Sequence, residues 1–291
     1  MVAPVPELAE VEAYRRLAES TALHRRVVAV DADDAWYLKG GTDPRVLEMA
    51  LVGSRFVAAR RIGKLLLLDT AADLDEGAGA QGPTLGLRFG MTGRLVVDGV
   101  PGVERLLYSG NGEEPAWDRF AVRFGVPSRR SGVSTGAGCT SPSVGRLVMR
   151  DPRRLGGVEL DPDEARLGPD ASTIGAGELR AALGSSTAPL KARLMDQARV
   201  AGVGNLTADE VLWRASLCPT RAAGGLNDAQ VRRLARVLRG TIAELIERGG
   251  SHTGELSASR LAGGQCPRDA TSLVRSTVGG RTTWWCPRHQ R

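Results

Sequence analysis

The stretch Ala201-Gly202-Val203-Gly204-Asn205 separates two segments whose apolar residues recur at helical spacing. Leu190 and Leu194 precede it, and Val211 and Leu212 follow it. Glycine lets a backbone approach another group closely, and the free amides at the start of a helix attract phosphate. A glycine turn between two helices more often serves only to cap them. The stretch therefore predicts two helices joined by a tight turn, with Asn205 opening the second helix, and it leaves a phosphate contact open.

The sequence around this turn is also typical of a helical domain. Residues 176–250 carry apolar side chains at helical spacing, and the pattern stops after Gly250. Residues 161–175 are rich in Pro, Asp and Gly, which indicates a linker. We therefore expect residues 176–250 to form a domain of their own.

The first half of the chain predicts one helix followed by many short strands. Residues 7–19 place Val11, Tyr14 and Leu17 at helical spacing. The β-type runs that follow are residues 26–30, 54–59, 64–68, 84–89, 93–97, 120–124 and 147–150. Such spacing is typical of a β-sandwich or barrel. We expect an α+β fold with an N-terminal β-sandwich domain over residues 1–160, interrupted by a Ser- and Gly-rich insertion at 125–144.

Composition and charge narrow the class of protein. The 291 residues are 42% hydrophobic and 25% charged, which excludes disorder of the whole chain. The longest aliphatic stretch, residues 65–68, is far shorter than the roughly 20 residues needed to cross a bilayer, so we expect a cytoplasmic protein. The formal net charge is +6, and six arginines face two acidic residues after residue 250. This charge suggests a polyanion as partner, although ordinary solvated surface charge explains it equally well.

Residues 251–291 predict a β-hairpin with a metal site. Cys266 and Asp269 form one pair and Cys286 and His289 another, with two residues inside each pair and 16 between the pairs. This is the spacing of a zinc ribbon in which two of the four cysteines are replaced. Both replacements can bind zinc, so we expect one structural Zn²⁺ at these four residues. A metal-free hairpin stabilised by its two tryptophans is the alternative.

Several segments together resemble one family, the formamidopyrimidine-DNA glycosylases and endonuclease VIII enzymes of base-excision repair. The matching segments are PELAEVE at 6–12, RRIGK at 60–64, FGMTGRL at 89–95, DPRRLG at 151–156, LGP at 167–169, LMDQ at 194–197, GVGN at 202–205 and GRTTWWC at 280–286. The resemblance spans nearly the whole chain. It implies a β-sandwich, a helix-two-turns-helix domain and a zinc-finger hairpin, with DNA in the cleft between the two domains.

The resemblance also implies a reaction. In this family the secondary amine of an N-terminal proline attacks the sugar, expels the base and forms an imine that allows both phosphates to be eliminated. Pro6 matches that nucleophile, Glu7 would transfer protons, and Glu10 would support this network. Lys64 would hold the phosphate near the lesion. The implied function is a bifunctional DNA glycosylase and abasic-site lyase that acts on oxidised or ring-opened bases.

Contacts with damaged double-stranded DNA follow from the same resemblance. Asn205 and Arg281 would clamp flanking phosphates, while Met91, Arg153 and Leu155 would fill the gap left by the flipped nucleotide. Leu155 departs from the aromatic residue usual at its position. The DNA-binding residues implied in full are Arg88, Met91, Arg153, Arg154, Leu155, Lys191, Asn205 and Arg281. We expect a monomer that associates with the nucleoid.

Pro6 decides whether this chain is an enzyme. Five residues precede it as written, and an internal proline nitrogen is an amide without a nucleophilic lone pair. The residue before it is Val5, which a conceptual translation writes for a GTG start codon. Initiation there, followed by removal of the methionine, would free the Pro6 amine. The alternative is a catalytically inactive protein that binds damage through the same DNA clamp.

Overall fold

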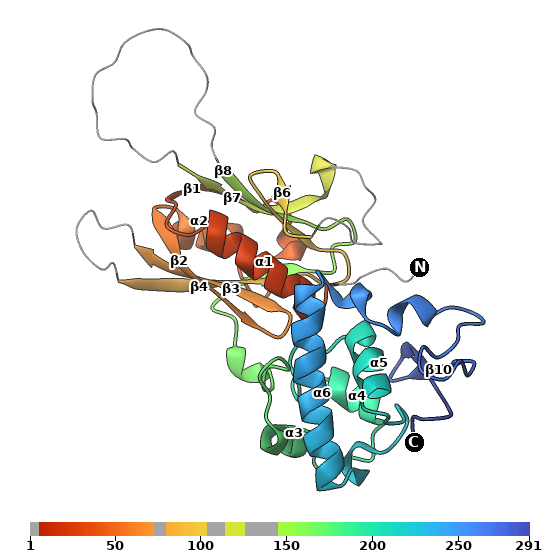
Figure 1. Cartoon of the computed structure of the whole chain (residues 1–291). Helices are drawn as coiled ribbons and strands as arrows, with labels where there is room; N and C mark the ends of the chain where they lie inside the picture. The colour runs from red at the N-terminus through yellow and green to blue at the C-terminus, as the bar shows by residue number, and fades with distance from the viewer. Residues whose placement is uncertain (1–5, 73–79, 104–113, 126–144) are drawn as a thin grey trace, which may run out of the picture.

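The computed structural model describes residues 6–72, 80–103, 114–125 and 145–291. Two layers of β-sheet form the N-terminal half, and helices followed by a hairpin form the C-terminal half (Figure 1). The α+β fold with a leading helix, two β-layers, a helical region and a C-terminal hairpin is thereby confirmed. The predicted insertion falls almost entirely on residues 126–144, which lie outside the described residues.

Two antiparallel sheets make up the N-terminal half. One has the strand order β1-β7-β8-β5-β6 and the other the order β2-β3-β4-β9. The strands of the first sheet are β1 (Val27–Asp31), β7 (Asp118–Phe124), β8 (Gly145–Arg150), β5 (Arg94–Val97) and β6 (Val100–Pro101). Those of the second are β2 (Ser54–Ile62), β3 (Leu65–Ala72), β4 (Gln81–Arg88) and β9 (Gly157–Leu160). All seven predicted strands form, and β6 and β9 are strands that the sequence pattern does not predict.

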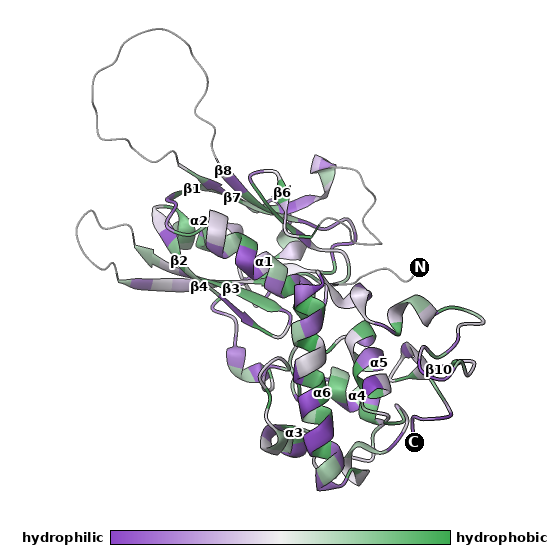
Figure 2. Cartoon of the chain, viewed as in Figure 1, coloured by the Kyte–Doolittle hydropathy of each residue, from purple (hydrophilic) through white to green (hydrophobic). Residues whose placement is uncertain are grey.

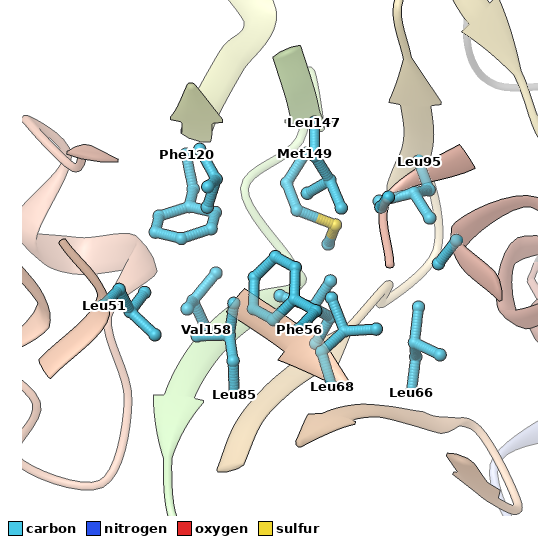
Figure 3. Packing of buried hydrophobic residues seen from close by; sticks show 14 of the residues in the cluster. Leu51, Phe56, Leu66, Leu68, Leu85, Leu95, Phe120, Leu147, Met149 and Val158 are labelled. Carbon is cyan, nitrogen blue, oxygen red and sulfur yellow. The ribbon is translucent and has the colours of Figure 1, made fainter. Parts of the chain in front are cut away.

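The N-terminal core lies between these two sheets. Phe120, Leu147 and Met149 point from one sheet toward Phe56 and Leu68 of the other (Figure 3). None of these five side chains is more than 1% exposed. Burying one large apolar side chain contributes roughly 1.5–3 kcal/mol, so this double layer is a rigid base for the loops at its edge.

Two helices pack on the sandwich. Helix α1 (Leu8–Thr21) buries Val11 and Tyr14 in the core, as the helical spacing predicts. Helix α2 (Pro44–Leu51) follows an N-cap aspartate, Asp43, whose carboxylate accepts hydrogen bonds from two backbone amides. The single-turn helices of this half are η1 (Ala35–Tyr37) and η2 (Pro115–Trp117).

The second half is helical. Its helices are η3 (Glu164–Arg166), α3 (Ala176–Leu183), α4 (Leu190–Met195), α5 (Asn205–Arg214), η4 (Ala223–Gly225) and α6 (Asp228–Glu247). Helix α6 carries strongly polar as well as apolar residues along its length (Figure 2), and its apolar residues pack into one core with α3, α4 and α5. Leu8 at the start of α1 belongs to this second core. The amino end of α1 therefore lies where the two halves meet.

The predicted turn at residues 201–205 is confirmed. Helix α4 ends at Met195 and helix α5 begins at Asn205. Gly202 has a φ of +108°, which only glycine adopts readily, and Gly204 is the N-cap residue of α5.

The chain ends in a β-hairpin. The single-turn helices η5 (Ser251–Thr253) and η6 (Ser257–Ser259) precede β10 (Val274–Val278) and β11 (Arg281–Trp285). Gly279 and Gly280 have φ values of +56° and +71°, as a two-residue turn with two positive φ angles requires. Among the residues that the structure describes, no helix is long and apolar enough to span a membrane.

Candidate active site

The amino end of α1 places two acidic side chains inside the protein. Glu7 directly precedes the helix and is 1% exposed, and Glu10 in the first turn is 0% exposed. The Glu7 amide donates a hydrogen bond of 2.9 Å to Glu10 Oε2. Pro6, the predicted nucleophile, is also buried and directly precedes Glu7. The predicted nucleophile and the two predicted proton-transfer groups therefore share one buried turn of chain.

The first turn of α5 binds the Glu7 carboxylate. Oε1 accepts a hydrogen bond of 2.8 Å from the Leu206 amide. Oε2 accepts two from Thr207, one of 3.0 Å from its amide and one of 2.5 Å from Oγ1. The start of a helix has unpaired amides and a partial positive charge, so it stabilises a carboxylate. Glu7 is thereby fixed against the same helix end that carries Asn205.

Gly204 leaves the room that the Glu7 side chain needs. A Cβ atom at this position would overlap the Glu7 carboxylate and its Cγ. We expect Gly204→Ala to lower the free energy of unfolding by about 1–3 kcal/mol, the usual cost of overpacking. Denaturant unfolding measures this effect. Gly177→Ala is the matched control, because a Cβ there meets nothing within 4 Å. Equal stability of the two variants would contradict the close contact between Gly204 and Glu7.

Glu10 connects α1 to the segment that follows α6. Its Oε1 accepts hydrogen bonds of 2.7 Å from both the amide and Oγ of Ser251. Burial, helped by the neighbouring Glu7 charge, raises the pKa of Glu10 above its ordinary value. Two carboxyl groups in different surroundings can divide the roles of acid and base between them. The pair therefore places two carboxyl groups in different surroundings close to Pro6.

Lys64 lies in the tight turn between β2 and β3. The neighbouring Gly63 has a φ of +57°, and its amide donates a hydrogen bond of 2.6 Å to Oδ2 of Asp170. Desolvation lowers the pKa of Lys64, while the charges of Glu7 and Glu10 act against this shift. The Lys64 ammonium thus lies within electrostatic reach of both carboxyl groups.

Asn205 and Arg281 approach the same region from the helical half. Asn205 opens α5, and its buried Oδ1 has no hydrogen-bond partner within the described part of the chain. Arg281 begins β11 and is exposed, and its charge adds to the lowering of the Lys64 pKa that desolvation causes. The free amides at a helix start attract phosphate, and a cation binds it by charge, so this group of residues is suited to binding phosphate. The structure therefore brings the residues of four separate motifs to one junction.

The three predicted wedge residues form one surface cluster. Nη1 of Arg153 lies 3.9 Å from Sδ of Met91. Leu155 is 50% exposed, and a Cβ on Gly90 would overlap its backbone. Asp151 holds this loop because its carboxylate accepts hydrogen bonds from the amides of Arg153, at 3.2 Å, and Gly156, at 2.8 Å. The loop before β9 and the turn after β4 thus present these side chains side by side.

Two further predicted DNA contacts are paired with acids at the surface. Arg88 forms an ion pair of 3.3 Å with Glu159, and Arg154 forms one with Asp34. The side chains of both arginines are at least 40% exposed. Exposed ion pairs of this kind contribute at most about 1 kcal/mol, so a phosphate can replace the acid.

The prediction that Lys191 contacts DNA is wrong. Its side chain is 0% exposed and forms an ion pair of 2.7 Å with Asp209. Its ammonium also donates hydrogen bonds to the carbonyl oxygen of Thr282 at 3.2 Å and to Oγ1 of Thr283 at 2.8 Å. An ammonium group has three protons, and three protein acceptors surround this one. Lys191 is therefore an internal group that presents no charge to a ligand.

Cys266, Asp269, Cys286 and His289 form a cluster that could hold a metal ion, with all ligand atoms within 4.8 Å of one another. Nδ1 of His289 lies 3.1 Å from Asp269 Oδ2 and 3.7 Å from Cys266 Sγ, and Cys286 Sγ lies 3.4 Å from Asp269 Oδ2. Zinc bonds of about 2.0–2.3 Å in a tetrahedron separate the ligand atoms by roughly 3.3–3.8 Å. A hydrogen bond from the Thr271 amide is the main cause that lowers the pKa of Asp269, which favours the ionised ligand. The donor set fits a zinc ion.

Two protein-family matches together cover most of the chain, including the residues of this site. The family described as Formamidopyrimidine-DNA glycosylase N-terminal domain matches residues 5–158, and the Formamidopyrimidine-DNA glycosylase H2TH domain matches residues 167–257. The chain belongs to the formamidopyrimidine-DNA glycosylase family. The second match contains the turn at residues 201–205, and the first contains Pro6, Glu7 and Lys64.

Individual formamidopyrimidine-DNA glycosylases are similar over their full length. The enzyme of Cereibacter sphaeroides is 31% identical over 313 residues, covering 99% of this chain and 100% of that protein. The one of Burkholderia cenocepacia is 32% identical over 308 residues, with the same coverage. A structure of Lactococcus lactis Fpg with DNA that contains an abasic site has a TM-score of 0.73 at 22% identity, covering 98% of this chain and 99% of that one. A structure of MutM with DNA that contains carbocyclic 8-oxo-G has a TM-score of 0.75 at 24% sequence identity, and it covers 98% of this chain and 100% of that one. These structures share the fold.

Several residues that stabilise this formamidopyrimidine-DNA glycosylase site have no signal in the sequence. Thr207 and Ser251 bind Glu7 and Glu10 across 200 and 241 residues of chain. Both are small polar residues of a kind common at helix starts, so their type alone does not single them out. Only the packing of the two halves shows what they contact.

Proposed function

We propose that this chain is a bifunctional DNA glycosylase and abasic-site lyase of base-excision repair that acts on oxidised or ring-opened bases. The observation that carries the proposal is the junction where Pro6 and Glu7 meet the start of α5, with Lys64 beside them. This junction supplies a nucleophile, a proton carrier and a cation for phosphate in one place. The names of the relatives, formamidopyrimidine-DNA glycosylases, support the substrate class.

The reaction requires a free secondary amine at Pro6. Its nitrogen lone pair forms a bond to C1′ of the damaged nucleotide, and the glycosidic bond breaks as the base leaves with its electron pair and a proton. The sugar ring opens as Glu7 protonates the ring oxygen, and the nitrogen loses its proton to leave an iminium ion. The iminium acidifies the neighbouring sugar proton, so the 3′ and then the 5′ phosphate are eliminated, and water releases Pro6.

Two neighbours of Glu7 support its proton transfer. Glu10 is buried, its pKa is raised by burial, and its Oε2 accepts a hydrogen bond from the Glu7 amide, so it would hold the Glu7 backbone in place beside Pro6. Lys64 would bind the phosphate beside the lesion and oppose the negative charge that enters the cleft.

The wedge formed by Met91, Arg153 and Leu155 would replace the damaged nucleotide in the stack after it leaves the duplex.

The competing proposal is a damage-binding protein that keeps the DNA contacts and lacks a nucleophile. It follows if the Pro6 nitrogen stays an amide, because an amide forms no imine. Borohydride reduces an imine to a stable amine bond. Covalent trapping on DNA with an abasic site therefore separates the two proposals, since only an imine-forming enzyme is attached to the DNA.

We also propose that the cluster of two cysteines, Asp269 and His289 binds one structural zinc ion. The distances between the donor atoms support this proposal, as does the burial of both thiols. Nε1 of Trp213 lies 3.3 Å from Cys266 Sγ, so one ligand already has a hydrogen-bond donor behind it. Zinc here would fix the end of β11, and with it the strand that begins at Arg281.

We expect Arg281→Ala to weaken binding to double-stranded DNA roughly tenfold and to lower the salt slope of binding by about 1, because one charged phosphate contact is lost. Titrations of a fluorescent duplex at several salt concentrations measure both quantities. Arg275→Ala is the matched control, since it removes the same charge from an exposed position on β10. If both variants lose the same DNA affinity and the same salt slope, Arg281 contributes only through the net charge of the protein and makes no specific phosphate contact.

The proposed partner is damaged double-stranded DNA, bound by a single copy of the chain. Residues from both halves of one chain supply the proposed nucleophile, the phosphate contacts and the wedge. A protein that repairs chromosomal DNA would work at the nucleoid.

A further inference from the structure

A buried group of polar side chains attaches strand β11 to the helical half. Lys191, Asp209, Arg260 and Thr283 are each at most 4% exposed. Asp209 forms ion pairs of 2.7 Å with Lys191 and 2.8 Å with Arg260. Its Oδ2 also accepts a hydrogen bond of 3.1 Å from the amide of Trp284. Burying several charges together has a large desolvation cost, which their mutual pairing offsets.

Thr283 links this buried group to Arg281. Its Oγ1 accepts a hydrogen bond of 2.8 Å from the Lys191 ammonium and donates one of 3.1 Å to the carbonyl oxygen of Arg281. A hydroxyl group can accept and donate at the same time, so one side chain joins the two. Lys191 also binds the carbonyl oxygen of Thr282 at 3.2 Å. The backbone that carries Arg281 is therefore attached to Lys191 directly and through Thr283.

Helix α5 carries the other half of the proposed phosphate clamp. Asn205 opens this helix, and Asp209 lies about one turn further along it. The hairpin packs beside α4 and α5 (Figure 1), and a Cβ on Gly279 at its turn would lie 2.9 Å from Cβ of Ala192. Asp209 thus connects the element that carries Asn205 to the element that carries Arg281.

We propose that Lys191 and Thr283 are positioning residues that set Arg281 at a fixed place relative to Asn205, so that both can bind neighbouring phosphates at once. This inference rests on the proposed function, because it assigns Arg281 to a DNA phosphate. It also gives Lys191 a role that needs no contact with DNA.

Thr283→Val tests the proposal, because it removes the hydroxyl group and keeps the branched shape. We expect it to weaken binding to a duplex with a tetrahydrofuran abasic-site analogue about fivefold, because both hydrogen bonds that join Lys191 to the Arg281 backbone through the hydroxyl group are lost. Thr283→Ser keeps the hydroxyl group and should restore binding to within about twofold. In an Arg281→Ala background, Thr283→Val should cause no further loss. Thr241→Val is the matched control, since Thr241 is buried in α6 and its Oγ1 has no hydrogen-bond partner within the described part of the chain.

Amide hydrogen exchange gives a second readout that needs no DNA. In Thr283→Val, the amides of β11 should exchange at least about tenfold faster than in the parent, while Thr241→Val leaves them unchanged. Unchanged exchange in Thr283→Val would overturn the attachment itself. A loss of binding that persists in full in the Arg281→Ala background would overturn the positioning of Arg281. A third outcome is faster exchange in Thr283→Val while both Thr283→Val and Arg281→Ala keep full affinity for DNA. That result would overturn the phosphate role of Arg281, and this inference with it. The proposed function would still be supported if the chain that begins at Pro6 is trapped on abasic DNA.

Discussion

A chain that begins at Pro6 will become covalently attached to DNA with an abasic site when borohydride is present. The free secondary amine forms an iminium with the opened sugar, and reduction makes that bond permanent. Pro6→Gly in the same chain replaces the secondary amine by a primary one at a changed geometry, and we expect trapping to fall by at least about 10²-fold because the attacking nitrogen is displaced. A denaturing gel with labelled DNA measures the attached fraction.

The same experiment with residues 1–5 retained isolates the chemistry of the nitrogen. In that chain the Pro6 nitrogen is an amide whose lone pair is delocalised, so we expect binding of the abasic duplex without trapping. Glu7→Gln in the chain that begins at Pro6 should trap about 10²–10⁴-fold more slowly, because the amine remains while the proton carrier is lost. If the chain that begins at Pro6 binds the duplex but is neither trapped nor cleaves it, the damage-binding proposal replaces the enzyme.

Parts of the site that depend on neighbours in sequence can be predicted from the sequence. Gly63 and Lys64 form one turn, Gly204 and Asn205 form one helix start, and Glu7 opens one helix. Each of these signals uses residue types that suit a single local conformation. The confirmed turn at residues 201–205 and the confirmed strands of the sandwich belong to this class.

Short elements are the parts of the fold that the sequence does not predict. Strand β9 has 4 residues, too few for an alternating pattern to stand out, and its burial depends on β4 beside it. Helix α2 has 8 residues, and its only clear signal is Asp43 followed by Pro44 at the first helical position. Such a pair is equally common in turns.

Lys191 shows why the direction of a side chain is harder to predict than the helix that carries it. The spacing of Leu190 and Leu194 predicts the helix, but α4 has only 6 residues, and the burial of Lys191 is decided by a hairpin about 90 residues later in the chain. A lysine is rarely buried, so the sequence favours an exposed one. The acceptors on Asp209, Thr282 and Thr283 reverse that expectation, and no local pattern indicates them.

Protein purified without chelator will contain one zinc ion per chain, and Cys286→Ala will lose it. Zinc binding at four donors is cooperative, so the loss of one thiolate should weaken the site at least about tenfold. Elemental analysis measures the metal content. Cys218→Ala is the matched control, because Cys218 lies outside the cluster and, in the part of the chain that the structure describes, its thiol contacts the hydroxyl group of Thr220. A content well below one zinc per chain in the parent protein would favour the metal-free hairpin.

The replacement of a thiolate by Asp269 also predicts how this site differs from a four-cysteine finger. Carboxylate is a weaker zinc ligand than thiolate, so Asp269→Cys should slow the release of zinc to a chelator by roughly tenfold or more. Removal of the metal should weaken DNA binding as well, because β11 runs from Arg281 to Trp285, the residue directly before Cys286. If Arg281 mediates this effect, chelation should weaken Arg281→Ala protein much less than the parent protein. Equal losses in the two proteins would mean that the zinc site acts on DNA through another part of the chain.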